Sequence, residues 1–269
     1  MSVDLRALVA DLAAEQDALD AVLRQLGPAH WELPTHAPGW AVRDQVTHLA
    51  FFDDAARLAI EDAAAFEPLR ERALREGLAL ETEYLARGRA MTAQELYAWW
   101  RESSRALTAA AQRLTGSERL PWFGPSMGAA SFITARLMET WSHGLDVVDV
   151  VPFDRPDTDR LRHVVELGIR TRPYSYQVRG LTPPDVPIRI ELRAPSGELW
   201  CFGPEDATDR IAGTATDFCR VVTQRRHLLD TDLQVTGAAA EEWMRIAQAF
   251  AGPPGPGRKP GEFPKGTQR

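Results

Sequence analysis

Cysteine is scarce in this sequence, since only Cys201 and Cys219 occur among its 269 residues. Two cysteines cannot build the disulfide framework that holds small secreted domains together. Neither residue belongs to a Cys-x-x-Cys pair, and cysteine is among the residue types most often found buried. We therefore expect both to be small buried hydrophobic residues rather than nucleophiles.

Long apolar runs are also absent. No segment approaches the roughly 20 apolar residues that a membrane-spanning helix needs, and residues 1–6 lack the basic region and apolar core of a secretory signal. The net charge of −7 argues against a nucleic-acid partner, because phosphate binding requires an excess of positive charge. We expect a cytoplasmic protein that binds neither membranes nor nucleic acids. The sequence leaves the oligomeric state open.

Common nucleotide-binding motifs are missing as well. The chain contains no Gly-x-Gly-x-x-Gly and no P-loop. What remains is an ordinary globular composition, with 44% hydrophobic and 26% charged residues. The length allows one large domain or two modest ones.

Apolar residues recur with a period near 3.6 along much of the first 150 residues, which is typical of amphipathic helices. The residues Thr92-Ala93-Gln94-Glu95 form a capping-box pattern, which marks a helix start. Residues 67–88 are charged and predicted to be helical with a weak apolar stripe. Four long helices, each with an apolar stripe, predict a four-helix bundle, over residues 3–26, 41–63, 92–114 and 129–150.

The period changes to two near residue 188, where Ile188, Ile190 and Leu192 alternate with charged residues. This predicts a strand, followed by a turn and a second strand. We predict a bundle over residues 1–155, a small α+β domain over 156–251, and a disordered tail over 252–269, which is rich in Pro and Gly. The elements expected in the α+β domain are helices over 157–169, 214–222 and 238–250 and strands over 188–193, 198–202 and 233–235.

One helix carries a pair of residues with metal-ligand chemistry. Glu139 and His143 are four residues apart, so their side chains lie on one helix face. Apolar residues flank the pair, and an unpaired carboxylate on an apolar face is costly. A bound metal ion is one way to make the carboxylate tolerable.

His48, in the middle of another predicted helix, is the best candidate for a third ligand; alternatively, it is a hydrogen-bonded core histidine. Asp44 and Asp146 lie one turn from His48 and His143, where each could orient an imidazole or simply face solvent. His36 lies in a proline-rich loop and could line the mouth of a site. The remaining histidines are expected at the surface: His30, His163 and His227.

Three segments resemble the DinB-like helical bundle family, in its mycothiol-dependent maleylpyruvate isomerase N-terminal type. They are Pro38–Asp44 with His48-Leu49-Ala50, Arg136–Glu139, and His143–Asp146. The resemblance covers roughly residues 1–150. It implies that His48, Glu139 and His143 bind a divalent metal, usually zinc. The C-terminal part is similar to a small sterol-carrier-like α+β domain, and the Pro121–Pro125 loop also resembles an uncharacterised metal-binding subgroup.

Two function classes follow from this resemblance. Three protein ligands leave an open coordination position, as in catalytic zinc sites, so the chain could be a metal- and thiol-dependent isomerase or transferase. Mycothiol would be the thiol, and the substrate a small electrophile. Arg220, Arg225 and Arg226 are candidates for holding a substrate carboxylate, with Arg225 the preferred catalytic residue; alternatively, they are surface charges. The other class is a non-catalytic metal-binding sensor or small-ligand carrier.

Overall fold

The computed structural model describes residues 4–264 and divides the chain into two compact units, Met1–Arg155 and Pro156–Arg269. The first unit is helical and the second combines helices with a four-stranded sheet, which confirms the predicted fold class. Among residues 4–264, no helix is long and apolar enough to cross a membrane.

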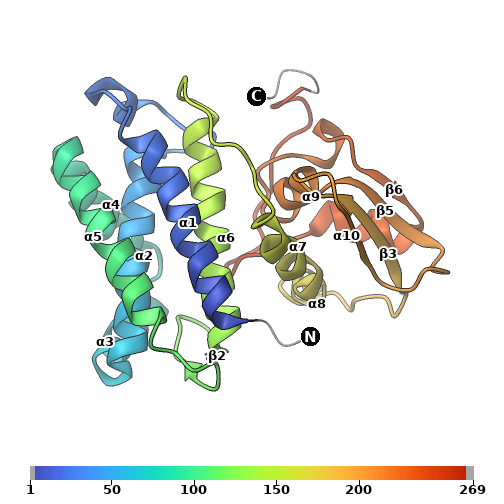
Figure 1. The fold of residues 1–269 in the computed structure, drawn as a ribbon, viewed down its shortest axis with the longest axis horizontal. Helices are drawn as coiled ribbons and strands as arrows, with labels where there is room; N and C mark the ends of the chain where they lie inside the picture. Colours follow the sequence, from blue (N-terminus) through green and yellow to red (C-terminus); the bar gives the residue numbers. More distant parts are fainter. Residues whose placement is uncertain (1–3, 265–269) are drawn as a thin grey trace. The chain divides into compact units, whose positions relative to one another are not determined.

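Four long helices form the bundle of the first unit (Figure 1): α1 Leu5–Leu23, α2 Val42–Glu61, α5 Ala93–Ala111 and α6 Ala129–Val148. Each helix packs against two others, since α1 and α2 both contact α5 and α6. Their apolar stripes meet in a core that includes Leu19, Val46, Leu96 and Val147, all of them fully buried. Burial of such side chains stabilises the bundle by roughly 1.5–3 kcal/mol each.

The capping box at Thr92 forms as predicted. The Thr92 hydroxyl accepts a hydrogen bond from the backbone N–H of Glu95, and the Glu95 carboxylate accepts one from the N–H of Thr92. Each interaction satisfies a backbone donor that lacks a partner within the helix. Residues 92–95 therefore fix where α5 begins.

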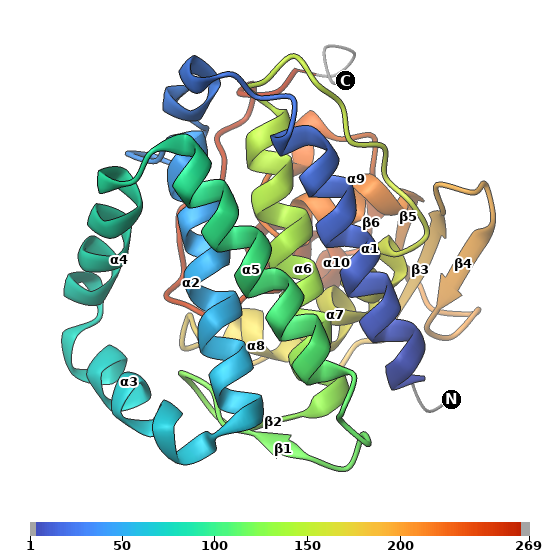
Figure 2. The ribbon, with the colours of Figure 1, turned by 60° about the vertical axis from the view of Figure 1, so that its left-hand side comes forward.

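The expected helix over residues 67–88 is instead two helices, α3 Ala63–Glu76 and α4 Leu78–Ala90. Gly77 separates them with φ = +45°, a left-handed conformation that an α-helix cannot contain and that glycine adopts at low cost. Both helices pack against α2 and run outside the bundle (Figure 2). This excursion carries Tyr84 to the candidate site described below.

The loop before α6 is framed by two short strands, β1 Arg119–Leu120 and β2 Met127–Gly128, which pair antiparallel. Its aromatic residues pack together, since the Trp122 and Phe123 rings meet edge to face at 4.8 Å, and the Phe66 ring stacks on Trp122 at 5.9 Å. Trp122 also meets Phe132 of α6 edge to face, at 5.0 Å. The loop is therefore tied to both α3 and α6.

The second unit contains a sheet with the strand order β4-β3-β5-β6. The central strands β3 and β5 pair parallel, and the outer strands pair antiparallel. Alternating Ile188, Ile190 and Leu192 are buried, as the period of two predicts. The elements of this unit are α7 Leu161–Arg170, α8 Arg172–Gln177, β3 Ile188–Arg193, β4 Leu199–Phe202, β5 Asp209–Thr214, α9 Ala215–Val222, β6 Gln234–Thr236 and α10 Ala238–Ile246.

The segment from residue 252 to residue 264 forms neither helix nor strand, yet it is attached to the second unit. Gly261 and Phe263 donate their backbone N–H groups to the Asp230 carboxylate. The Phe263 ring is buried, with the Arg226 guanidinium 3.6 Å from its centroid. A disordered tail was expected over 252–269 because this segment has few apolar residues to bury. The buried ring of Phe263 is the contact that this expectation left out. Residues 265–269 lie outside the described part of the chain.

Candidate metal centre

Helix α6 carries two of the three predicted ligands. Because Glu139 and His143 are one turn apart, their side chains meet, with 3.1 Å between Nε2 of His143 and Oε2 of Glu139. Most of α6 is buried, so both groups project from a helix whose position is fixed by packing. The local spacing alone therefore delivers a carboxylate and an imidazole to one point.

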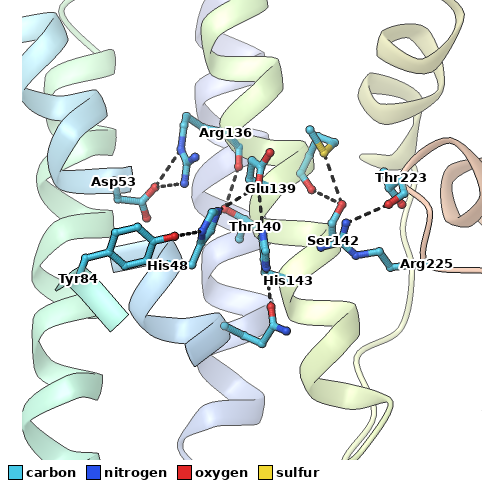
Figure 3. Close-up of polar contacts among 12 residues, drawn as sticks. His48, Asp53, Tyr84, Arg136, Glu139, Thr140, Ser142, His143, Thr223 and Arg225 are labelled. Carbon is cyan, nitrogen blue, oxygen red and sulfur yellow. Dashed lines mark hydrogen bonds and ion pairs between the residues drawn. The ribbon is translucent and has the colours of Figure 1, made fainter. Parts of the chain in front are cut away.

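Helix α2 delivers the third group from the opposite side of the site. Nε2 of His48 lies 3.5 Å from the same oxygen, Oε2 of Glu139, and the two imidazole rings are 4.2 Å apart between centroids. Ligand atoms of all three residues lie within 4.8 Å of one another. Figure 3 shows both imidazoles turned towards the carboxylate.

The electrostatics of the cluster favour a bound cation. Burial, reinforced by His143, lowers the pKa of His48 to about 3, so this imidazole is neutral near pH 7. Burial alone would raise the pKa of Glu139, but the two imidazoles beside its carboxylate hold that pKa well below its usual range. A neutral imidazole and an ionised carboxylate are the forms that bind metals.

Each imidazole uses its other nitrogen to contact a neutral partner. Nδ1 of His48 lies 3.2 Å from the hydroxyl of Tyr84 in α4, and Nδ1 of His143 lies 2.5 Å from Oε1 of Gln45 in α2. Burial, and then nearby carboxylates, raise the pKa of Tyr84, so its hydroxyl keeps its proton. The Trp40 ring stacks near His143 at 6.0 Å between centroids. Partners of this kind fix the orientation of metal-binding histidines.

A buried ion pair lies beside the cluster. Arg136, one turn before Glu139 on α6, donates to Oδ1 of Asp53 in α2 at 2.8 Å. Both side chains are nearly inaccessible. Burial raises the pKa of Asp53 to about 6, against the opposing effect of Arg136. The pair is charge-neutral when ionised, so Glu139 supplies the unbalanced negative charge of the site.

Aromatic rings lie next to His48. Phe52, one turn further along α2, has its ring 4.5 Å from the His48 imidazole, and Phe123 of the loop meets Phe52 edge to face at 5.4 Å. These two rings are only partly buried. The cluster therefore has an apolar neighbourhood suited to an organic ligand.

The donor set fits a zinc-like divalent ion. Two imidazole nitrogens and one carboxylate oxygen converge from two rigid helices, and zinc binds this combination in catalytic sites that keep an open position. The exposed fractions of the His48 and Glu139 side chains are 16% and 21%, so a small ligand has access to the donor atoms. His48, Glu139 and His143 would hold the ion.

Several other expectations about single residues need correction. Asp44 was expected either to orient His48 or to face solvent, but its buried carboxylate instead accepts hydrogen bonds from the backbone N–H of Ala41, at the start of α2, and from the guanidinium of Arg89 in α4. Asp44 therefore joins two helices. Cys219 is buried as expected, but Cys201 is exposed because it faces outward from β4.

His30, His36 and His227 lie outside the metal cluster. His36 is exposed in its loop, and His227 accepts the backbone N–H of Leu229 at the start of a short 3-10 helix. His30 is partly buried rather than at the surface, because it accepts the N–H of Gly27 and packs against Phe153.

The three candidate arginines lie in the second unit. Arg220 pairs with Asp217 at 3.6 Å, and Arg226 stacks on Phe263, which favours structural roles for both. Arg225 donates to the backbone carbonyl of Thr223 at 2.9 Å. Its catalytic role stays a prediction.

Sequence analysis missed Gln45, Tyr84, and the Asp53–Arg136 pair. Gln45 lies three residues before His48 on the same face of α2, so helical spacing contained a signal for it. Tyr84 comes from a helix with a weak apolar stripe, and nothing local connects it to His48. These partners depend on tertiary packing.

Comparison with known proteins gives a family match over the bundle. The family model described as the mycothiol maleylpyruvate isomerase N-terminal domain matches residues 12–148, half of the chain. A second model, described as wyosine base formation, matches residues 184–236. Two proteins from different strains of Mycobacterium tuberculosis, both described as uncharacterized, are 46% identical over 250 residues, which is 93% of this chain and 97% of each relative.

Solved structures share the fold. A crystal structure of the mycothiol-dependent maleylpyruvate isomerase superposes with a TM-score of 0.60 at 16% identity, covering 88% of this chain and 94% of that one. A structure of a mutant of that enzyme gives a TM-score of 0.59 at 15% identity, with the same coverage. At these identities the likeness concerns the fold.

Proposed function

Because the chain belongs to the family of the mycothiol maleylpyruvate isomerase N-terminal domain, we propose that it binds a divalent metal, preferentially zinc, and works with a low-molecular-weight thiol such as mycothiol. The reaction would be isomerisation of, or S-transfer to, a small electrophilic substrate. The observation that carries the proposal is the convergence of two Nε2 atoms on one carboxylate oxygen of Glu139.

The charges around the site suit an anionic thiolate. A zinc ion held by His48, Glu139 and His143 would lower the pKa of a bound thiol and favour its thiolate form. With two neutral imidazoles and one carboxylate, the loaded site would carry a net positive charge. The Asp53–Arg136 pair adds no net charge when ionised. The aromatic rings of Phe52 and Phe123 would exclude water from an organic substrate.

The proposed chemistry balances without any further co-reactant. The thiolate sulfur forms a bond to one carbon of an activated double bond, and the electron pair moves onto the group that activates it. The adduct then rotates about the resulting single bond. Reversal of the addition breaks the C–S bond and returns the thiolate, which completes an isomerisation; protonation and release of the adduct would complete a transfer. Arg225 is the candidate for holding a substrate carboxylate.

Turnover measurements with zinc-loaded protein and mycothiol test this function. Maleylpyruvate, the substrate named for the structural relative, is the first probe, followed by other small activated alkenes. We expect isomer or thiol adduct to form with mycothiol and zinc, and to be lost on removing either or in His143→Ala. If the protein binds zinc but neither isomerises nor consumes thiol with any probe, the alternative of a non-catalytic metal-binding sensor or carrier is favoured.

A further inference from the structure

A hydrogen-bond chain ends at His143, and its polarity is set at the far end by the backbone of the loop before α2. The carbonyl oxygen of Trp40 can only accept hydrogen bonds. Oγ1 of Thr35 lies 2.9 Å from it, so the hydroxyl donates its single proton there. The same Oγ1 lies 2.9 Å from Nε2 of Gln45 and, with its proton already used, accepts from that amide.

Gln45 therefore turns its amide oxygen towards His143. Oε1 of Gln45 lies 2.5 Å from Nδ1 of the imidazole, and an amide oxygen can only accept. The proton between them must belong to Nδ1 of His143. A neutral imidazole protonated at Nδ1 has its lone pair on Nε2, the atom that lies 3.1 Å from Glu139. Gln45 is completely buried, so solvent does not compete for its amide.

We propose that Thr35 and Gln45 are positioning residues that hold His143 in the tautomer whose Nε2 lone pair faces Glu139. This proposal rests on the proposed metal site, to which it adds the groups that prepare one ligand. It also gives a role to the loop before α2. The backbone N–H of Thr35 donates to the carbonyl of Trp40 at 2.8 Å, so the fold of the loop holds the acceptor on which the polarity depends.

Two pairs of variants test the chain. Thr35→Val keeps the size of the side chain but removes the hydroxyl, whereas Thr35→Ser retains it. Gln45→Leu removes the acceptor for Nδ1–H, whereas Gln45→Glu retains one. We expect Thr35→Val and Gln45→Leu to lower zinc affinity by about 10–100-fold, the usual effect of losing such a partner. The serine and glutamate variants should keep most of the wild-type affinity, which a simple packing role for residues 35 and 45 would not explain.

A second readout does not depend on metal. Long-range ¹H–¹⁵N correlation spectra of the metal-free protein identify the protonated ring nitrogen of His143, with His143→Gln to assign the signals. We expect Nδ1 to be protonated in the wild type and in Thr35→Ser, and a mixture of tautomers in Thr35→Val.

The outcomes separate the two proposals. Wild-type zinc affinity and spectra in both Thr35→Val and Gln45→Leu would overturn the positioning role while leaving the metal site intact. If the wild type binds no zinc, the proposed function fails, and the spectra alone decide: a wild-type His143 protonated only at Nε2 would overturn the inference.

Discussion

His48 and His143 present the same ring atom, Nε2, to one carboxylate oxygen, although they come from different helices. The two distances to Oε2 of Glu139 are 3.5 and 3.1 Å. Lone pairs of two imidazoles and a carboxylate that face one point repel each other unless a cation or protons lie between them. The packing of α2 against α6 maintains this arrangement, so the fold stabilises a site whose donors need a positive partner.

Removing one donor should therefore abolish most of the metal binding while leaving the bundle folded. We expect His143→Ala to lose more zinc affinity than the roughly 10–100-fold typical of losing an outer hydrogen-bond partner. The core residues of the bundle lie elsewhere along the helices, so the circular dichroism spectrum should not change. A competition titration against a chromogenic zinc chelator measures the affinity.

The matched control is His36→Ala, which removes an exposed histidine from a loop of the same unit. It should bind zinc like the wild type. Equal zinc binding by His143→Ala and the wild type would show that the site is assigned to the wrong residues.

The sequence could predict the features that depend on local spacing. The apolar stripes of four helices predicted the bundle, because each stripe must be buried against another helix. These helices are α1, α2, α5 and α6. The Glu139–His143 pair followed from helical geometry. The position of His48 in the middle of another predicted helix made it the best candidate for the third ligand, but a hydrogen-bonded core histidine stayed an alternative. Only the family resemblance implied the three residues as one set, because no spacing rule relates one helix to another.

Features that depend on tertiary packing were missed. The central strand β5 contains Asp209, Gly213 and one large apolar residue, Ile211, so it shows no strand pattern; its neighbour β3 provides the pairing. Tyr84 reaches His48 only because Gly77 bends the chain between α3 and α4. These features arise when separate elements meet.

The buried Asp53–Arg136 pair predicts a pH dependence of stability. Burial raises the pKa of Asp53 from 3.8 to about 6 in the folded protein, so the folded form binds this proton more tightly than the unfolded chain. The stabilisation from this group is fully present below pH 3.8 and is lost as the pH rises through about 6. Relative to Asp53→Asn, the wild type should lose on the order of 2–3 kcal/mol of unfolding free energy across that window.

Urea denaturation at several pH values, for the wild type and Asp53→Asn, measures this difference. Asparagine keeps an acceptor for Arg136 but cannot ionise, so the constant cost of the substitution cancels in the pH dependence. High salt should change the window little, because the pair is buried. Parallel stability curves for the two proteins would contradict the prediction.

The Phe263 ring should stabilise the second unit. It is buried, it lies under the Arg226 guanidinium, and its backbone N–H donates to Asp230. We expect Phe263→Ala to cost about 3 kcal/mol of unfolding free energy, through lost burial and a lost cation–π contact. Thermal unfolding followed by calorimetry measures the loss. Glu262→Ala, at an exposed neighbouring position, is the control, and equal melting temperatures for both variants would refute the anchoring role.

Gly88 in α4 lies so close to Thr47 in α2 that no larger residue fits. A Cβ at position 88 would lie 1.9 Å from Oγ1 of Thr47 and 2.6 Å from its Cγ2. Thr47 is fully buried and its hydroxyl donates to the carbonyl of Arg43, so it has little freedom to move. In Gly88→Ala, α4 must therefore shift away from α2. Tyr84, one turn earlier on the same face of α4, should move away from His48 with it.

We expect Gly88→Ala to be less stable than the wild type by about 1–2 kcal/mol, because the cost of overpacking exceeds the gain of about 1 kcal/mol in helix propensity. Zinc affinity should fall as well, because His48 loses its Tyr84 partner. Thermal unfolding and zinc titration measure the two effects. The double variant Gly88→Ala with Thr47→Ala removes the two closest clashing atoms and should recover part of both losses beyond additivity. Wild-type stability and zinc affinity in Gly88→Ala would show that the spacing between α2 and α4 does not control the site.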